Sequence, residues 1–210
     1  MSNLDTTVII CCAGMGTRLG IGTTKALLHV DGKPLIIHQL EMLSSFDDVR
    51  VVVGYQADKV IETVNSYRKD IMFVFNNRYN STSPSESRIK GMINSRDYVL
   101  SIDCDIMIKP DDFDKLTEID GEFMAVSDVH SEEPVLVEVE NGNARRFSEN
   151  GKFEWPGVIK VKRERLKNSS GRIEGLLPVP VAFVESRDID TSDDYANVVR
   201  WAENDYKSGD

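Results

Sequence analysis

The stretch 10–25 holds the residue types that could bind phosphate. An apolar, β-prone run stops at small residues and enters a glycine-rich turn, after which Arg18 and Lys25 supply two cations seven positions apart. Gly14 and Gly16 lack a Cβ, so the backbone there can adopt positive φ and lie close to a ligand. Successive N–H groups in such a turn bind anions, while an arginine offers a planar fork and a lysine a point charge. The spacing therefore predicts a phosphate site.

Two common phosphate motifs do not match this stretch. A P-loop needs Gly-x-x-x-x-Gly-Lys-Ser/Thr, whereas Lys25 is preceded by Thr24 and followed by Ala26. A dinucleotide fingerprint needs Gly-x-Gly-x-x-Gly, and Leu19 stands where the third glycine should be. A flexible turn without a ligand stays the alternative interpretation.

Two carboxylates follow an apolar run further along the chain. The run 98–108 reads as one strand and carries Asp103 and Asp105 at positions i and i+2. Alternate residues of a strand face the same way, so both side chains could approach one hard cation. The alternative is that the two carboxylates only add solubility at a strand end or cap the helix that begins near Pro110. Asp103 and Asp105 are therefore both candidate metal ligands.

The segment 76–87 is polar and precedes a helix. Ser83 as N-cap, Pro84 at the first helical position and Glu86 three residues after the cap predict a capping box. Capping does not explain the segment's other polar side chains, which are candidates for contacts to a nucleotide or an acceptor: Asn76, Asn80, Ser85 and Ser87.

The segment 181–195 reads as a strand followed by a helix that begins near Ser192. An N-cap formed by Thr191 with Asp194 would leave the Asp190 side chain free for another contact. A cap formed by Asp190 with Asp193 is the alternative, because N-cap assignments are uncertain by a residue or two.

The elements that must position these residues alternate between strands and helices. Strands are expected at 7–12, 49–54, 71–75 and 98–108, with helices at 34–43 and 58–66. This order predicts an α/β fold with a doubly wound, mostly parallel sheet, helices on both faces, and ligands at the carboxyl ends of the strands. Beyond Pro110 the runs 124–126, 135–139 and 145–147, with a hairpin at Asn141–Gly142, predict a small antiparallel β insertion. We expect one domain, residues 1–210, with the insertion at 123–162.

Composition narrows the class of protein. The chain has 210 residues, 40% of them hydrophobic and 29% charged, and a net charge of −10, which argues against nucleic-acid binding. No apolar run reaches the length of a membrane span, and the first residues lack the features of a secretory signal. The three cysteines have no metal-ligand spacing. We therefore expect reduced core thiols and a cytoplasmic location.

The motifs together resemble a known family. The pattern Gly-x-Gly-Thr-Arg-Leu…Lys, continued by Gly32-Lys33-Pro34-Leu35, resembles the nucleotidyltransferases with a GT-A-like fold, of the MobA-like and sugar-phosphate types. Thr24 stands where that family usually has proline. The segment 76–87 looks like the cytidylyltransferases that activate choline phosphate and related alcohol phosphates. Its Ser-x-Ser-x-x-x-Gly pattern also resembles the molybdopterin-cofactor enzymes, and 189–195 resembles the family's closing motif.

This resemblance implies a reaction. A nucleoside monophosphate, with CTP the expected donor, passes to a phosphorylated small alcohol or sugar, pyrophosphate leaves and Mg²⁺ assists. Arg18 would hold the β- and γ-phosphates, and Lys25 would stabilise charge on the α-phosphoryl oxygens. The implied nucleotide contacts are Ala13, Gly14, Met15, Gly16, Thr17, Asn80, Ser85 and Ser87. The implied metal ligands are Asp105 and Asp190, with Asp103 and Asp188 as substitutes. The insertion 123–162 would cover the acceptor.

Three alternatives stay open. A sugar-1-phosphate nucleotidyltransferase would use UTP, dTTP or GTP. A GT-A-type glycosyltransferase would share the Asp-x-Asp pattern but has no need of Arg18 and Lys25 in a glycine-rich loop, because it expels no pyrophosphate. A non-catalytic nucleotide-binding module could lack the metal carboxylates. The sequence names neither the acceptor nor the oligomeric state. The resemblance is compatible with an enzyme that makes precursors of cell-surface polysaccharide or lipid, and with a homodimer.

Overall fold

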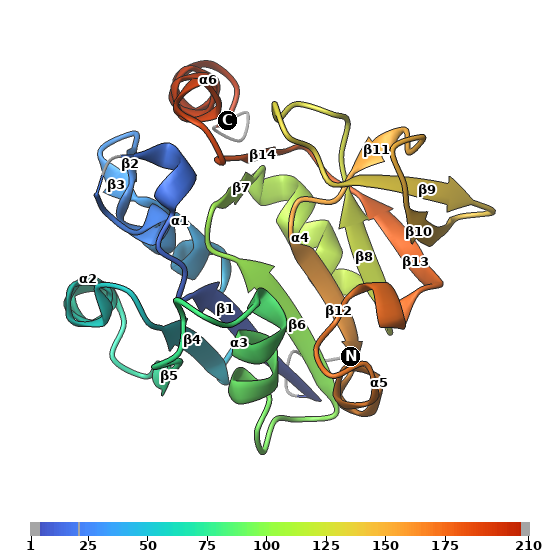
Figure 1. Ribbon diagram of the computed structural model, residues 1–210, viewed down its shortest axis with the longest axis horizontal. Helices are drawn as coiled ribbons and strands as arrows, with labels where there is room; N and C mark the ends of the chain where they lie inside the picture. Colours follow the sequence, from blue (N-terminus) through green and yellow to red (C-terminus); the bar gives the residue numbers. More distant parts are fainter. Residues whose placement is uncertain (1–4, 21, 207–210) are drawn as a thin grey trace.

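A mixed β-sheet runs through the molecule in the computed structural model, which describes residues 5–20 and 22–206 (Figure 1). Its first half is parallel, in the spatial order β5 (Met72–Phe75), β4 (Val49–Val53), β1 (Thr6–Cys12) and β6 (Tyr98–Asp103). The side chains of β1 and β4 are almost all buried, because helices cover both faces of a parallel sheet. The chain runs from β1 to β4 and β5 on one side and returns to β6 on the other. The carboxyl ends of β1 and β6 therefore form the switch point at which such sheets bind ligands.

The second half of the sheet is mostly antiparallel. Beyond β6 lie, in order, β12 (Val158–Lys162), β8 (Phe123–Val126), β13 (Val179–Phe183), β10 (Asn143–Phe147), β9 (Leu136–Glu140) and β11 (Phe153–Glu154). Only the β8–β13 pair among them is parallel within the described residues. Asn141 and Gly142 join β9 to β10 with φ of 51° and 73°, which confirms the predicted hairpin.

Helices cover both faces of the sheet, as predicted. On one face lie α1 (Leu35–Met42), α2 (Ala57–Tyr67) and α4 (Pro110–Glu118), and on the other lie α3 (Pro84–Gly91) and α5 (Arg163–Asn168). Ile36, Val60 and Phe113 are fully buried in the core of the first face, and Leu166 is fully buried in the core of the second. The fold is therefore α/β, with a doubly wound parallel half and an antiparallel extension.

Smaller elements complete the arrangement around the carboxyl ends of the strands. A two-stranded sheet joins β7 (Ile106–Ile108) to β14 (Ser186–Asp188), and α6 (Ser192–Asn204) follows β14 directly. A second small sheet joins β2 (His29–Val30) to β3 (Lys33–Pro34). Short 3₁₀ turns occur at Thr17–Leu19, Lys25–Leu27 and Glu174–Leu176. No helix within 5–20 and 22–206 has the length and apolar character needed to cross a bilayer.

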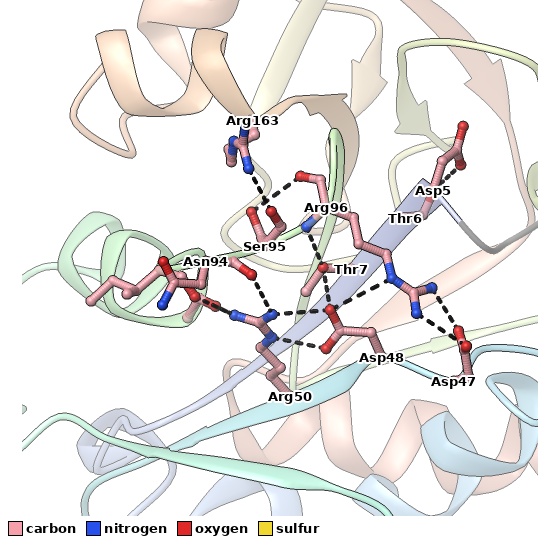
Figure 2. A network of polar contacts seen from close by, with 12 residues as sticks. Asp5, Thr6, Thr7, Asp47, Asp48, Arg50, Asn94, Ser95, Arg96 and Arg163 are labelled. Atoms are coloured by element: carbon pink, nitrogen blue, oxygen red, sulfur yellow. Dashed lines mark hydrogen bonds and ion pairs between the residues drawn. The ribbon is translucent and has the colours of Figure 1, made fainter.

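A polar network fixes the amino ends of β1 and β4 (Figure 2). Thr7 donates a hydrogen bond to Asp48 at 2.5 Å, and Arg50 binds the same carboxylate at 2.9 Å. Arg50 also donates to main-chain carbonyls at the end of α3, and Arg96 pairs with Asp47 at 2.6 Å. Asp47, Asp48, Arg50 and Arg96 are therefore paired with one another at the end of the sheet opposite the carboxyl ends of β1 and β6.

Candidate active site

A cavity of about 310 Å³ opens at the carboxyl ends of β1 and β6. Its walls are the glycine-rich loop, the turn after β6 and the segment 76–87. Nine of the predicted site residues line it, namely Ala13, Gly14, Gly16, Thr17, Lys25, Asn76, Ser87, Asp103 and Asp105. Three other predicted nucleotide contacts, Met15, Asn80 and Ser85, are not part of its lining.

The glycine-rich loop folds against Lys25. Gly16 has φ of 59°, and a Cβ at this position would lie 3.1 Å from Cγ of Lys25. Glycine therefore permits both the left-handed backbone and the close contact. The backbone of Arg18 lies in the 3₁₀ turn Thr17–Leu19, but its side chain lies outside the described part of the structure, so its role stays a prediction.

Gln56 supports the second half of the loop, a role that no motif in the sequence indicates. Its backbone is left-handed, with φ of 51°, at the N-cap of α2. The side-chain oxygen accepts hydrogen bonds from the Thr23 hydroxyl at 3.1 Å and from the Thr24 N–H at 3.4 Å, and the amide donates to the Gly22 carbonyl at 3.0 Å. Thr24, in the position where proline is usual, has a buried hydroxyl with no hydrogen-bond partner among the described residues.

Lys25 joins two of the predicted metal carboxylates. Its Nζ donates to Oδ2 of Asp105 at 2.9 Å and to Oδ1 of Asp190 at 2.5 Å, and its side chain is 10% exposed. Burial alone would lower the pKa of Lys25, but Asp105 and Asp190 together raise it above its ordinary value. The lysine is therefore charged at neutral pH and holds together residues that are 80 and 165 positions away in the sequence.

Asp105 lies in a turn and not on a strand. β6 ends at Asp103, and residues 104 and 105 form the turn before β7. The prediction that Asp103 and Asp105 share one strand face is therefore wrong. The buried amide of Gln39, on α1, donates to the carbonyls of Asp103 at 2.9 Å and Ile106 at 3.2 Å, so a helix residue holds the turn in place.

Asp103 has its own partner. Arg88, buried on α3, donates to both oxygens of this carboxylate at 3.2 and 3.3 Å and also to the Ser101 hydroxyl at 3.2 Å. The guanidinium carbon lies 5.7 Å from the ring centre of Trp155. Burial raises the pKa of Asp103 to about 6, with Arg88 opposing the shift. Gly157, with φ of 81°, packs so closely that a Cβ there would lie 2.8 Å from Cβ of Asp103.

Asp190 is placed by the start of α6. Thr191 is the N-cap and its hydroxyl accepts the Asp194 N–H at 3.1 Å, so the predicted N-cap formed by Thr191 with Asp194 is confirmed. The Asp194 carboxylate in turn accepts the N–H groups of Asp190 at 3.1 Å and Thr191 at 2.9 Å. The backbone of Asp190 is thereby fixed, and its carboxylate reaches Lys25.

The charges around Lys25 suit a divalent cation. Burial raises the pKa of Asp188 well above its ordinary value, and the negative charges of Asp105 and Asp190 raise it further. One ammonium group thus stands among three carboxylates. Carboxylate oxygens are the ligands that Mg²⁺ takes in nucleotide sites, where phosphate oxygens and water complete its shell. No ready-made group of three or more acidic, histidine or cysteine ligands occurs in the described part of the chain, so a bound nucleotide would have to supply the remaining ligands.

The segment 76–87 forms the opposite wall. Asn76 is buried, and its amide donates to the hydroxyls of Thr82 at 3.0 Å and Ser87 at 3.2 Å. The Thr82 hydroxyl donates its own proton to the Arg78 carbonyl at 3.0 Å. Asn76 was a candidate from the sequence, whereas Thr82 was not singled out.

The predicted capping box at α3 is wrong. Ser83 is the N-cap but its hydroxyl bonds to that of Ser85 at 3.1 Å instead of to the helix backbone. The Glu86 carboxylate, expected to reach back to the cap, pairs with Arg78 at 2.8 Å. A charged partner outside the helix competes successfully for the carboxylate because charge-assisted hydrogen bonds are the stronger ones.

Comparison with known proteins gives one match to a family model and several to individual proteins. The model of the MobA-like NTP transferase domain matches residues 8–149. The bifunctional protein GlmU of Aliarcobacter butzleri is 30% identical over 146 residues, which are 68% of this chain and 33% of that protein. The chain spans about a third of the length of the GlmU proteins that it matches.

Solved structures share the fold. The CTP:phosphocholine cytidylyltransferase from Streptococcus pneumoniae is similar with a TM-score of 0.71 and 22% identity, over 93% of this chain and 98% of that one. The inositol-1-phosphate CTP transferase from T. maritima is similar with a TM-score of 0.77 and 14% identity, over 97% and 98%. At these identities the likeness concerns the fold.

Proposed function

This chain belongs to the MobA-like NTP transferase family and is a nucleotidyltransferase of the sugar-phosphate or choline-phosphate type, and from that premise we propose that it transfers a cytidylyl group from CTP to a small phosphorylated alcohol. The acceptor phosphate attacks the α-phosphorus, a new P–O–P bond forms, the bond to the β-phosphate breaks and pyrophosphate leaves. The observation that carries the proposal is the position of Lys25, which joins Asp105 and Asp190 beside the cavity.

The chain's own groups position and neutralise the phosphates. The N–H groups of the glycine-rich loop face phosphate oxygens, and Arg18 holds the β- and γ-phosphates that leave. Lys25 turns from its carboxylates to the α-phosphoryl oxygens as charge builds there. No protein nucleophile is needed, because positioning and electrostatic stabilisation supply most of the catalysis at phosphorus.

Asp105 and Asp190 are the residues that would hold Mg²⁺, and a bound cation would favour the charged form of the neighbouring Asp188. The ion, when bound, supplies charge neutralisation at the phosphate oxygens. Asp103 stays paired with Arg88 and shapes the cavity wall.

The hydrogen bonds of Thr82 support a preference for cytosine. This hydroxyl lines the cavity, accepts from Asn76 and gives its only proton to the Arg78 carbonyl. Its remaining lone pair can accept a hydrogen bond but cannot donate one. The exocyclic amine of cytosine is a donor, whereas uracil has a carbonyl there, which would face an acceptor. An unpaired buried polar group costs about 1–3 kcal/mol, enough to discriminate between the two bases.

A pyrophosphate-release assay tests the proposal. kcat/KM is measured for CTP, UTP, ATP and GTP with a panel of phosphorylated alcohols and sugar 1-phosphates. We expect CTP to exceed the others by about tenfold or more, which corresponds to about 1.4 kcal/mol. UTP or a purine nucleotide ahead of CTP would refute the base assignment, and a sugar 1-phosphate as the best acceptor would refute the acceptor class.

Two variants link the base preference to Thr82. Thr82→Val removes the acceptor and should lower the CTP-to-UTP ratio of kcat/KM several-fold, since about 1 kcal/mol of discrimination is lost. Thr82→Ser keeps the hydroxyl and is the matched control, with the ratio unchanged. An unchanged ratio in Thr82→Val would show that another group reads the base.

A further inference from the structure

Thr24 carries a buried hydroxyl that has no hydrogen-bond partner among the described residues. The residue is 0% exposed, and its Oγ1 is left unpaired. An unpaired buried hydroxyl costs folding free energy, so its presence in a native protein calls for an explanation. Thr24 directly precedes Lys25 and belongs to the lining of the cavity at the carboxyl ends of β1 and β6. The missing partner is therefore to be sought in that cavity.

The backbone at position 24 does not require threonine. Its φ of −69° and ψ of 144° lie in the region that proline prefers, so the proline that is usual in similar sequences would fit here. Threonine adds an N–H and a hydroxyl that proline lacks, and the N–H donates to the Gln56 side chain at 3.4 Å. Valine would fill the same space without a polar oxygen. The hydroxyl is thus the one group of this side chain that the described contacts leave without a role.

The glycine-rich loop lies against the backbone on both sides of Thr24. A Cβ at Gly16 would lie 3.6 Å from the carbonyl oxygen of the residue before Thr24 and 3.7 Å from the nitrogen of the residue after it. A Cβ at Gly14, Gly20 or Gly22 would meet no described atom within 4 Å. Among these four glycines, close contact is therefore limited to Gly16, and the loop on either side of it has room to shift.

The chemistry around Thr24 favours an anionic oxygen as the partner. The ammonium group of Lys25 and the N–H groups of the glycine-rich loop both attract phosphate. Phosphate oxygens accept hydrogen bonds, and a threonine hydroxyl can donate one. In the proposed reaction Lys25 serves the α-phosphoryl oxygens. Gly16, which packs beside Thr24, belongs instead to the loop that carries Arg18 and faces the phosphates that leave.

We propose that the Thr24 hydroxyl donates a hydrogen bond to an oxygen of the leaving pyrophosphate, once nucleotide binding has moved the glycine-rich loop off the backbone around Thr24. This inference rests on the proposed nucleotidyl transfer, because that reaction brings a triphosphate into the cavity. The hydroxyl is unpaired without the ligand and paired with it, so the free energy that its burial costs is recovered on binding. The same group therefore destabilises the unliganded protein and strengthens the binding of pyrophosphate.

Thr24→Val tests both effects, because valine keeps the shape of the side chain and removes the hydroxyl. Without ligand, the variant should unfold at a higher urea concentration than the wild type, with an equilibrium constant for folding about fivefold larger or more. Its Kd for magnesium pyrophosphate, measured by isothermal titration calorimetry, should be about tenfold higher. Thr24→Ser keeps the hydroxyl and is the matched control, whose Kd should stay within about twofold of the wild-type value.

CMP shows which phosphate the hydroxyl contacts. This nucleotide has the base and the α-phosphate but lacks the two phosphates that leave, so the wild type and Thr24→Val should bind it with equal Kd. An equal loss for CMP and pyrophosphate would place the contact elsewhere and overturn the proposal.

The remaining outcomes separate this inference from the proposed function. If Thr24→Val is no more stable than the wild type without ligand, the hydroxyl has a partner in the free protein and the proposal is wrong. If the wild type binds pyrophosphate and Thr24→Val binds it as tightly, the inference fails while the nucleotidyl transfer stands. A wild type that binds neither pyrophosphate nor CMP would overturn both.

Discussion

Replacing Lys25 by methionine should destabilise the protein and leave the carboxylates around it without a positive charge, which Mg²⁺ can supply. Methionine keeps an unbranched side chain, one atom shorter, but removes the charge that joins Asp105 and Asp190 at 2.9 and 2.5 Å. Removing one partner of a buried ion pair costs about 3–5 kcal/mol. The Asp105 side chain is 23% exposed, so solvent screens part of this cost and we expect about 3 kcal/mol. For a chain of this size that loss lowers Tm by about 6–12 °C.

The sign of the pH dependence follows from the direction of the pKa shift. The pKa of Lys25 in the folded protein lies above its value in the unfolded chain, because the two carboxylates outweigh the effect of burial. The stabilisation by Lys25 is therefore fully present below about pH 10 and is lost as the pH rises through the folded value. At pH 7 the free energies of unfolding of the wild type and of Lys25→Met should therefore differ by the whole stabilisation that Lys25 provides.

Urea unfolding at pH 7, with and without MgCl₂, measures this prediction. Mg²⁺ should restore part of the stability of Lys25→Met, because it replaces one cation among three carboxylates, while turnover stays low. Lys33→Met is the matched control. Lys33 pairs with Glu41 at 2.8 Å but its side chain is 45% exposed, so Lys33→Met should lose less than about 1 kcal/mol of unfolding free energy. If Lys25→Met is as stable as Lys33→Met, or gains nothing from Mg²⁺ beyond the gain of the wild type, the reasoning about the carboxylate cluster is refuted.

Three further predictions concern the same site and the core around it. Asp105→Asn should lower turnover by about 100-fold or more at limiting Mg²⁺ with an unchanged circular dichroism spectrum, and near-normal turnover would contradict its metal role. Gly157→Ala should cost about 2–4 kcal/mol in urea unfolding because it adds a clash with Asp103 to a backbone at φ of 81°. Gly142→Ala, at φ of 73° with open space around it, should cost only about 1 kcal/mol, so equal losses would exclude the clash. Burial raises the pKa of the Cys11 thiol to about 12, which leaves about one thiolate in ten thousand at pH 8. Cys11 should therefore resist iodoacetamide until guanidinium unfolds the chain, and rapid alkylation of Cys11 in the native protein would show a reactive thiol.

The parallel half of the fold could be predicted because its signals are local. The apolar runs of β1 and β4 and the alternation with helices indicate a buried parallel sheet, and the Asn141–Gly142 turn indicates the hairpin. The glycine-rich loop and Lys25 could be placed at a carboxyl edge for the same reason. These features depend on residues that are close in the sequence.

Contacts between distant residues could not be predicted in this way. Gln39 holds the turn after β6 from a helix more than 60 positions earlier, and Arg88 takes the Asp103 carboxylate from another helix. The turn at Asp105 was missed because an apolar strand continues on both sides of it. At α3 the residue types match a capping box, but the Glu86 carboxylate pairs with Arg78 instead. A capping rule based on residue types alone does not consider such a partner outside the helix.

Identification of the products tests the central claim most directly. The full chain is incubated with CTP, a phosphorylated alcohol and Mg²⁺, and the mixture is followed by phosphorus NMR. We predict that pyrophosphate and a cytidine diphosphate ester form in equal amounts, that both disappear when the divalent cation is chelated, and that the acceptor's phosphate is retained in the ester. Release of inorganic phosphate with CDP, or consumption of a nucleotide-sugar in place of a nucleoside triphosphate, would contradict transfer at the α-phosphorus.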